Sequence, residues 1–450
     1  MTIAPNSTKG APQCGVGEVN CADLEVALLT GGQDVSYVYG LATTLSGRGM
    51  YVRVVGGKSV DCEEFHTSER ITLVDLGGIS PTAGFATKLI QLTVYYSRLL
   101  WYVTFCSPKI LHTLWNSKLE YFDRTLLTFY FKLLGKRVVL TAHNVNKAKR
   151  DLHDSFLNRL TLTIQYRLSD QIFVHTETMK EELVQGFGVA PDRAKVIPFG
   201  INILVPDTEL SASQAKHRLS IRTDDRTILF YGRIVPYKGL ECLVEAFHHL
   251  ARRDARARLI IAGEPMKGFE EYIKRIRRAI ANEESSDRIL CRLEFIPDHE
   301  TELYFKAADV VVLPYKNIFE SGVLFLAYRF GLPVIASNVG SFGAEIAKGK
   351  TGLVFESGDS AALVATMETF FKSEFYKDAS NQRHRIQEYS RSHHSWQTVG
   401  DITECTYRAL LKQRDNLDCG FIEATRWAKR EDDQICGNAD RTEIEKVETW

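Results

Sequence analysis

The sequence predicts an α/β protein built from two doubly wound parallel-sheet domains that face each other across a cleft. Short apolar runs alternate with helix-like segments along most of the chain, which is typical of parallel sheets covered by helices. A polar stretch at residues 206–225 interrupts this alternation once, after which it resumes. With 450 residues, the chain is also longer than one hydrophobic core usually serves.

The composition is that of a globular protein, with 44% apolar and 25% charged residues. The formal net charge is zero, so the totals give no argument for a nucleic-acid partner. The nine cysteines are scattered and form no C-x-x-C pair, which favours reduced thiols in the cytoplasm. The N-terminus has no signal-type apolar stretch.

The first half of the chain is expected to hold a flexible leader at 1–22 and an N-terminal domain at 23–205. Its glycine pair, Gly31-Gly32, lacks the spacing of a G-x-G-x-x-G dinucleotide fingerprint. Apolar periodicity predicts strands at 24–29, 51–55, 71–75, 109–114, 137–141, 171–175 and 195–197, and helices at 35–45, 85–103, 122–134, 157–168 and 179–185.

The second half repeats the plan after a linker at 206–225, which includes a short helix at 212–219. A C-terminal domain is expected at 226–385, a closing helix at 386–412 and a charged tail at 413–450. The pattern predicts strands at 228–231, 259–262, 293–295, 310–313, 334–337 and 351–355, and helices at 240–247, 269–281, 301–308, 322–330 and 361–371.

Two cations, Arg233 and Lys238, lie on the loop between the first strand and the first helix of the second half. In an open α/β sheet, ligands bind at the carboxyl ends of the strands. Two cations beside a helix N-terminus suit an anion such as a diphosphate. Taken alone, the pair also fits solvated side chains on a surface turn.

The helix at 322–330 offers a second anion site at its N-terminus. The free amides after Ser321-Gly322-Val323 lie at the positive end of the helix dipole, and Gly322 lets a phosphate approach closely. Ser321 is expected to cap the helix. A serine cap without any ligand explains the same residues.

Two further groups lie at the active edge of the first sheet. Gly31-Gly32 follows the first strand and His143 follows the strand at 137–141. The glycines would let a ligand approach the backbone, or only form a tight turn. His143 is either a ligand-facing group or a structural turn residue.

Four ordered stretches of the second half resemble the retaining glycosyltransferases of the large family four, which have the GT-B fold of two Rossmann-like domains. The first half matches more loosely, and the resemblance covers about residues 24–412. The matching stretches are Phe230-Tyr231-Gly232-Arg233 to Lys238-Gly239, Ile261-Ala262-Gly263-Glu264, Ala307-Ala308-Asp309 to Pro314, Gly331-Leu332-Pro333-Val334-Ile335-Ala336-Ser337, and, in the first half, Leu28-Leu29-Thr30-Gly31-Gly32 and Thr141-Ala142-His143-Asn144.

The resemblance implies transfer of a sugar from a nucleotide-diphosphate sugar to a carbohydrate, lipid or other small acceptor, with retention of the anomeric configuration. The second domain would hold most of the donor. It implies that Arg233 and Lys238 hold the diphosphate and that His143 faces the donor sugar. The other implied donor-binding residues are Gly31, Gly32, Gly263, Glu264, Glu320, Ser321, Gly322 and Val323. No metal, separate cofactor or protein base is expected.

The chain departs from the family pattern at one place. Two glutamates eight positions apart are usual between the strand-ending proline and the Gly-x-Pro, and here the spacing places Ile318 and Leu326 there. Glu320 lies two residues away and would substitute in part. A divergent subfamily is the preferred explanation, and a catalytically weakened GT-B scaffold is the second. A sugar-nucleotide epimerase is a third interpretation, although no convincing acid–base pair of carboxylates is found.

A membrane-surface contact is also predicted, from the aromatic segment Leu89–Phe105 with Lys88 and Arg98, and from the nearby Lys132, Lys136 and Arg137. The segment is too short and polar to span a bilayer, but an apolar face with basic flanks can rest on one. The alternative is that this face belongs to the core.

Overall fold

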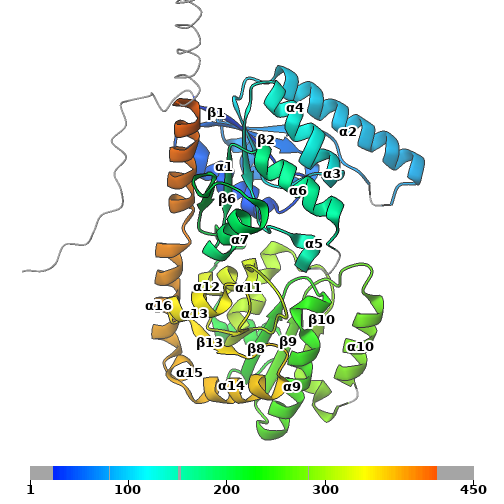
Figure 1. Ribbon diagram of the computed structural model, residues 1–450. Helices are drawn as coiled ribbons and strands as arrows, with labels where there is room; N and C mark the ends of the chain where they lie inside the picture. Colours follow the sequence, from blue (N-terminus) through cyan, green and yellow to red (C-terminus); the bar gives the residue numbers. More distant parts are fainter. Residues whose placement is uncertain (1–23, 81, 151–153, 282, 413–450) are drawn as a thin grey trace, which may run out of the picture.

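The computed structural model describes residues 24–80, 82–150, 154–281 and 283–412. Over these ranges the chain forms two α/β domains, stacked one above the other in Figure 1. The predicted two parallel sheets are confirmed. The expected leader and charged tail lie outside the described residues.

The N-terminal domain contains a seven-stranded sheet in the order β3-β2-β1-β4-β5-β6-β7. Every pairing is parallel, and β1 lies at the switch point where the strand order reverses. The strands are β1 (Glu25–Leu29), β2 (Tyr51–Gly56), β3 (Ile71–Asp75), β4 (Ile110–Thr113), β5 (Arg137–Thr141), β6 (Gln171–Val174) and β7 (Ala194–Val196).

The helices of this domain cover both faces of the sheet, and most begin where the apolar periodicity predicts. The expected helix at 122–134 is divided by a π-turn at Asp123–Leu127, between α3 and α4. The helices are α1 (Val35–Gly47), α2 (Phe85–Phe105), α3 (Glu120–Phe122), α4 (Thr128–Leu133), α5 (Lys147–Arg150), α6 (Phe156–Leu168) and α7 (Glu177–Phe187). None of the helices in the described ranges is long and apolar enough to cross a membrane.

The C-terminal domain contains a six-stranded parallel sheet in the order β10-β9-β8-β11-β12-β13. The strand expected at 293–295 is wrong: the edge strand lies earlier, because residues 289–292 pair with β9 while Phe295 is 70% exposed. The strands are β8 (Arg226–Tyr231), β9 (Ala257–Ala262), β10 (Ile289–Arg292), β11 (Val310–Leu313), β12 (Val334–Ser337) and β13 (Gly352–Phe355).

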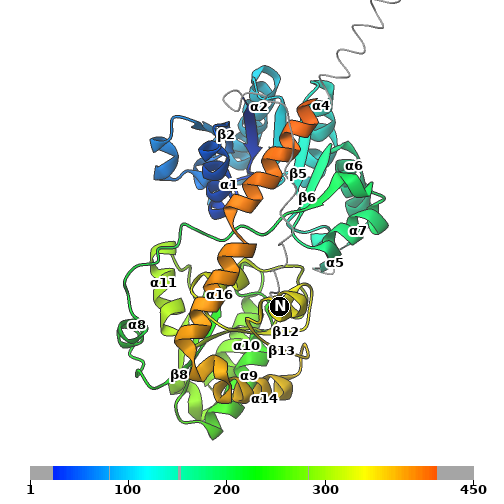
Figure 2. The ribbon, with the colours of Figure 1, turned by 90° about the vertical axis from the view of Figure 1, so that its left-hand side faces the viewer.

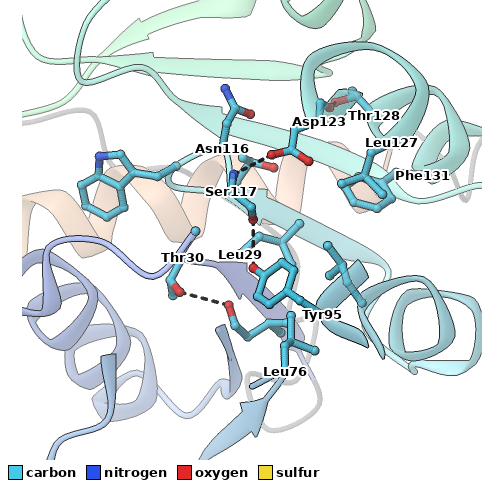
Figure 3. Close-up of a pocket in the computed structure, with 15 residues that line it drawn as sticks. Leu29, Thr30, Leu76, Tyr95, Asn116, Ser117, Asp123, Leu127, Thr128 and Phe131 are labelled. Atoms are coloured by element: carbon cyan, nitrogen blue, oxygen red, sulfur yellow. Dashed lines mark hydrogen bonds between the residues drawn. The ribbon is translucent and has the colours of Figure 1, made fainter. Parts of the chain in front are cut away.

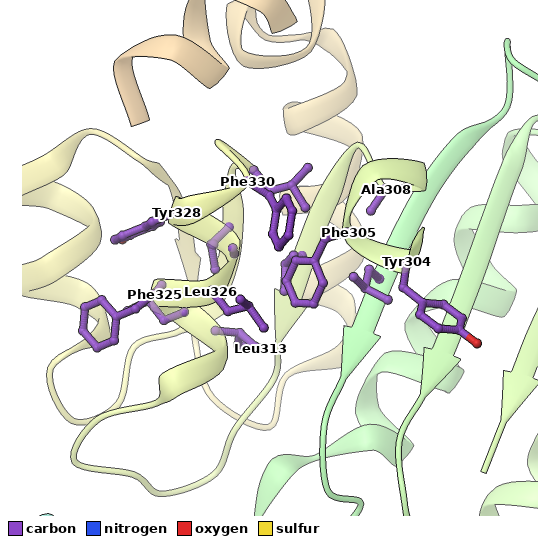
Figure 4. Packing of buried hydrophobic residues seen from close by; sticks show 14 of the residues in the cluster. Tyr304, Phe305, Ala308, Leu313, Phe325, Leu326, Tyr328 and Phe330 are labelled. Carbon is purple, nitrogen blue, oxygen red and sulfur yellow. The ribbon is translucent and has the colours of Figure 1, made fainter. Parts of the chain in front are cut away.

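One core cluster lies beneath the helices on each face of this sheet. Figure 4 shows the cluster under α11 and α12, where the rings of Phe305 and Phe330 stack with centroids 5.4 Å apart. The helices are α8 (Ala212–Arg218), α9 (Leu240–Arg253), α10 (Glu270–Ala281), α11 (Asp298–Ala307), α12 (Gly322–Arg329), α13 (Phe342–Gly349), α14 (Ser360–Lys372), α15 (Glu374–Lys377) and α16 (Ala379–His393).

Residues 206–225, expected to form a linker, pack on the C-terminal domain instead. Ala215 of α8 and Ile221 are buried in its core cluster. The Nζ of Lys216 donates to the Asp225 carbonyl at 2.6 Å and to Asp309 at 3.0 Å. The burial of these apolar side chains outweighs the polar composition of the segment. The chain therefore crosses from one domain to the other before residue 206.

The expected closing helix at 386–412 is two helices. α16 ends at His393 on the C-terminal domain, and a last helix at 396–412 packs on the N-terminal domain. Figure 2 shows this pair running from one domain to the other. Trp396 begins the last helix and donates its indole N–H to the Ile201 carbonyl at 2.7 Å.

Candidate functional site

The loop after β8 is held tightly between neighbouring strand ends. A Cβ on Gly263, at the end of β9, would lie 2.0 Å from the Gly232 carbonyl oxygen, and a Cβ on Gly239 would lie 2.0 Å from that of Pro314. Gly232 and Gly239 also have positive φ, of 96° and 65°. Glycine is therefore needed for this close packing, and it fixes the backbone that carries the two cations.

The two cations differ in their surroundings. Lys238 ends a 3₁₀ turn that begins at Pro236 and is only 7% exposed. Its ammonium nitrogen lies 5.3 Å from the centre of the Tyr315 ring, within cation–π range. Arg233 is exposed to solvent. Packing therefore orients Lys238, whereas Arg233 keeps its conformational freedom.

The N-terminus of α12 faces the same space. Ser321 occupies the N-cap position, but its side chain makes no capping hydrogen bond; its Oγ lies 3.5 Å from the Tyr315 hydroxyl. The expected serine cap is therefore wrong. The amides at this helix end have no side-chain acceptor from Ser321, so they remain suited to an external anion.

These groups line a cavity of about 430 Å³ between the two domains. Arg233, Lys238 and the start of α12 lie on its C-terminal side. Its full lining is Asp34, Ser36, Tyr37, Phe199, Gly200 and Asn202 from the N-terminal side, and Gly232, Arg233, Tyr237, Lys238, Tyr315, Ile318, Glu320, Ser321, Gly322, Val323 and Leu326 from the C-terminal side.

The departure predicted from the sequence lies in this lining. Ile318 and Leu326 are 8% and 6% exposed and belong to the core cluster of the C-terminal domain. Neither side chain can accept a hydrogen bond. Glu320 lies between them in sequence, and its Oε2 is buried with no hydrogen-bond partner among the described residues. Burial, and then the nearby Glu345, raise the pKa of Glu320 well above its ordinary value.

His143 lies behind the cavity and not in its lining. Its ring stacks on Trp115, with centroids 4.3 Å apart, and meets the cavity-lining Tyr37 edge-on at 4.6 Å. Its Nδ1 lies 3.0 Å from the Nε2 of His175. Burial, then the neighbouring His175, hold the pKa of His143 well below its usual value. The ring is therefore neutral at pH 7.

The His143 Nε2 is buried and has no hydrogen-bond partner in the described ranges. A neutral imidazole can donate or accept one hydrogen bond there, but it brings no positive charge to the site. The arrangement suits contact with a hydroxyl group more than contact with a phosphate.

The remaining residues expected at the site lie apart from this lining. Glu264 is exposed on the loop after β9, where its carbonyl accepts the Ile234 amide at 2.9 Å. Gly31 and Gly32 form the turn after β1, with φ of 58° and 72°. A Cβ on Gly31 would lie 2.6 Å from the Asn116 carbonyl oxygen, so close packing of this turn explains that glycine.

Gly31 lines a second cavity, of about 20 Å³, inside the N-terminal domain (Figure 3). Polar groups meet there: the Ser117 amide donates to Asp123 at 2.6 Å, and the hydroxyls of Tyr95 and Ser117 lie 2.9 Å apart. Burial raises the pKa of Asp123 to about 6. This space is the size of a water molecule and does not suit a larger ligand.

The sequence did not single out the aromatic side chains of the cavity as site residues. Tyr37 has the same helical spacing as core residues of α1, and Phe199 and Tyr315 simply follow strands. Only the apposition of the two domains distinguishes them. No group of three or more His, Cys, Asp or Glu side chains in the described ranges is arranged to hold a metal ion.

Two family models match the chain in succession. The model described as Glycosyltransferase Family 4 matches residues 31–203, and the one described as Glycosyl transferases group 1 matches residues 212–393. Together they cover most of both domains. The chain belongs to the family-4 glycosyltransferases with the GT-B fold, as the sequence motifs predict.

The curated relatives include proteins named D-inositol 3-phosphate glycosyltransferase. The protein from Corynebacterium diphtheriae is 26% identical over 75% of this chain and 81% of its own length. The protein from Corynebacterium efficiens is 27% identical over 52% of this chain. The chain spans only 57% of that relative's length and 49% of that of the Streptosporangium roseum relative.

Solved structures share the fold at low sequence identity. Sucrose-phosphate synthase from Thermosynechococcus elongatus has a TM-score of 0.69 at 19% identity, over 87% of this chain and all of its own. Anabaena HepE in complex with UDP-glucose has a TM-score of 0.66 at 16% identity, over 86% of this chain and 99% of its own. Identities this low show the fold alone.

Proposed function

We propose that the protein transfers a sugar from a nucleotide-diphosphate sugar to a carbohydrate or lipid-linked acceptor, in the cytoplasm and with retention of the anomeric configuration. One observation carries the proposal: Lys238, Arg233 and the N-terminus of α12 face the same interdomain cavity. Its volume of about 430 Å³ lies in the range usual for small-molecule sites.

The two cations and the helix end act on the leaving group. As the bond between the anomeric carbon and the diphosphate oxygen breaks, negative charge develops on the diphosphate. Oriented positive groups stabilise that charge best where water is excluded. Lys238, which is buried, is the main contact, Arg233 adds a second charge, and the α12 dipole adds its partial charge. The proposal includes no metal ion.

Retention follows if the acceptor attacks from the face that the diphosphate leaves. A diphosphate oxygen then accepts the proton of the acceptor hydroxyl as the new glycosidic bond forms, so the protein need not supply a base. The carboxyl groups in the described lining of the cavity are Asp34 and Glu320. The raised pKa of Glu320 favours its protonated form, which donates a hydrogen bond and does not act as a base. Glu320 instead suits hydrogen bonding to the sugar.

Similar proteins support the choice of donor and acceptor. Anabaena HepE has been solved in complex with UDP and with UDP-glucose, and the curated relatives are named for D-inositol 3-phosphate. These names support a polyhydroxyl acceptor, bound beside the N-terminal side of the cavity. The aromatic rings of Tyr37 and Phe199 offer apolar surface for such a ligand.

A donor panel tests the proposal. The purified full-length chain is incubated with UDP-, GDP- and ADP-sugars and carbohydrate acceptors, and the release of nucleoside diphosphate is measured. We expect release from one donor class, a product whose anomeric proton coupling in NMR matches that of the donor, and unchanged turnover with EDTA. Inversion of the anomeric configuration would contradict the proposed retention, and loss of activity with EDTA would contradict the proposed independence from metal ions.

The second candidate is a catalytically weakened protein that binds nucleotide sugars without turning them over. The observation that favours it is the placement of Ile318 and Leu326 in the cavity lining, where relatives usually present glutamates. Calorimetric titration with the same donors separates the candidates, because the second predicts binding without nucleotide release. Formation of an epimeric nucleotide sugar would instead indicate the epimerase interpretation.

A further inference from the structure

α2 exposes large apolar side chains along the side that faces away from the sheet. Ile90 is 65% exposed, Val94 41%, Trp101 70% and Phe105 68%. Single exposed apolar residues are ordinary on a protein surface, but a continuous group of large ones marks an interaction site.

The inner side of α2 already has its packing partners. Tyr95, Tyr96, Leu99 and Val103 are buried in a cluster with residues of the π-turn and α4. The outer residues therefore do not belong to the core, and the alternative considered for Leu89–Phe105 accounts for only one side of the helix. A helix that is apolar on both sides and buried on one needs a second apolar environment.

Large apolar side chains are also exposed on the neighbouring elements. Leu126 and Leu133, in and after the π-turn, are 65% and 67% exposed, and Phe156 at the start of α6 is 83% exposed. Figure 1 shows α2, α4 and α6 beside one another on the N-terminal domain.

Buried hydrogen bonds hold these helices together. Tyr96 of α2 donates to Asp123 in the π-turn at 2.9 Å, and Arg124 of that turn donates to Asn158 of α6 at 2.9 Å. We name α2, the π-turn with α4, and α6 together the outer helical face.

The charge pattern of α2 and its flanking segments indicates what covers the outer helical face. From Leu76 to Leu119 the chain has no Asp or Glu but carries Lys88, Arg98, Lys109 and Lys118. Arg98, Lys109 and Lys118 are exposed and Lys88 is partly exposed. Such cations attract an anionic surface. A second copy of the chain, paired through α2, would bring like charges together.

We propose that the outer helical face rests on an anionic lipid bilayer. Ile90, Trp101 and Phe105 lie at the level of the acyl chains, and Lys88 and Arg98 contact the phosphate headgroups. The contact does not depend on sugar transfer, since a chain without turnover would still bind lipid. With the proposed reaction, it brings the N-terminal domain to a lipid-linked acceptor.

Vesicle co-sedimentation of the full-length chain tests the inference, with vesicles of phosphatidylcholine alone or mixed with phosphatidylglycerol. We expect binding to the mixed vesicles at low salt and much weaker binding to the neutral ones. Removing two surface cations, with Lys88→Gln and Arg98→Gln, should weaken binding roughly 30-fold. Ile90→Ser with Trp101→Ser should weaken it at least about tenfold.

Matched variants on the other domain serve as controls. Phe295→Ser replaces a phenylalanine that is 70% exposed on the C-terminal domain, and Arg277→Gln with Arg278→Gln removes two exposed cations of α10. Both should bind the mixed vesicles like the wild type. Circular dichroism establishes that every variant is folded.

Three results would overturn the inference: equal binding to both vesicle types, equal losses in the control variants, or no vesicle binding by the wild type. A dimer in analytical ultracentrifugation that Ile90→Ser with Trp101→Ser dissociates would assign the face to a second copy instead. Nucleotide release with a water-soluble acceptor should be unchanged in these variants, so failure of the lipid contact and failure of the proposed function are distinguishable.

Discussion

Lys238 and Arg233 have equal charge but unequal surroundings, so their removal should have unequal effects. Lys238 is buried and oriented by packing, whereas Arg233 is exposed and its field is screened by water. Lys238→Ala should lower kcat/KM by about 10²–10³-fold, the usual loss for one oriented transition-state donor. Arg233→Ala should cost less, about tenfold.

Steady-state kinetics with the donor identified by the panel measures both values. Lys274→Ala, on the exposed side of α10, is the control and should leave kcat/KM unchanged. Equal losses of kcat/KM in Lys238→Ala and Arg233→Ala would show that burial does not determine how much each cation contributes to catalysis. Wild-type kinetics in both variants would remove them from the site.

Glu320 should make the stability of the fold depend on pH. Its folded pKa is raised above 4.5 by burial, so above pH 4.5 the folded state holds a proton that the unfolded chain releases. The free energy of unfolding is therefore greatest below that pH and falls as the pH rises through the folded pKa. Glu320→Gln removes this loss.

Thermal denaturation from pH 4.5 to pH 8 measures the effect. The variant should melt above the wild type at pH 8, and a recovered ~1 kcal/mol corresponds to roughly 2–4 °C. The difference should shrink toward pH 4.5. Glu264→Gln, at an exposed position, should follow the wild type. A constant difference at every pH would show that Glu320 does not titrate as proposed.

At the scale of elements, most strands were predictable because burial on both faces makes them continuous apolar runs; β5, β11 and β12 have the expected bounds. The edge strand β3 also has its expected bounds, although it is only partly buried. The edge strand β10 was misplaced because apolar residues on both sides of Arg292 fit a short strand equally well. The π-turn at Asp123–Leu127 was not predicted, because one wider turn changes the spacing of apolar residues too little to be recognised in so short a segment.

Part of the candidate site was predictable because the strands that lead into it were predictable. The loop after β8 and the start of α12 follow strand ends, which can be located from sequence. The cavity-lining aromatics and the His143–His175 pair depend on how distant segments meet. The absence of the serine cap was also not predictable, since the Ser321 Oγ lies 3.5 Å from the Tyr315 hydroxyl and makes no hydrogen bond to the helix amides.

The last helix should align the two domains through Trp396. Its ring packs where a Cβ on Gly40 or Gly200 would lie within 2.1 or 2.3 Å of it, and its N–H reaches the Ile201 carbonyl. Trp396→Ala should destabilise the protein by about 3–5 kcal/mol, since it empties a filled junction. Trp101→Ala, at an exposed position, should cost almost nothing.

Chemical denaturation of both variants measures these costs, and nucleotide release reports whether the cleft still forms. A fully active Trp396→Ala protein of wild-type stability would show that the junction does not depend on this ring. The other contacts of the last helix would then be sufficient to align the two domains. One of them joins the Tyr407 hydroxyl and His112 Nδ1, which lie 2.6 Å apart.

At the scale of the whole molecule, the cavity is asymmetric. Eleven of its lining residues come from the C-terminal side and six from the N-terminal side, and both predicted diphosphate cations belong to the eleven. A nucleotide without its sugar should therefore bind mainly to the C-terminal domain and leave the N-terminal domain nearly as mobile as before. Binding to the folded state lowers local opening where the contacts are made.

Hydrogen exchange with and without UDP tests this asymmetry. UDP should slow amide exchange in residues 232–239 and at the start of α12, with little change in β2 and β3 at the far edge of the N-terminal sheet. In Lys238→Ala the protection should disappear at the same UDP concentration, because the charge that holds the diphosphate is absent. Equal protection in both domains would instead mean that the nucleotide alone closes the cleft, and the acceptor side would then be organised before any acceptor arrives.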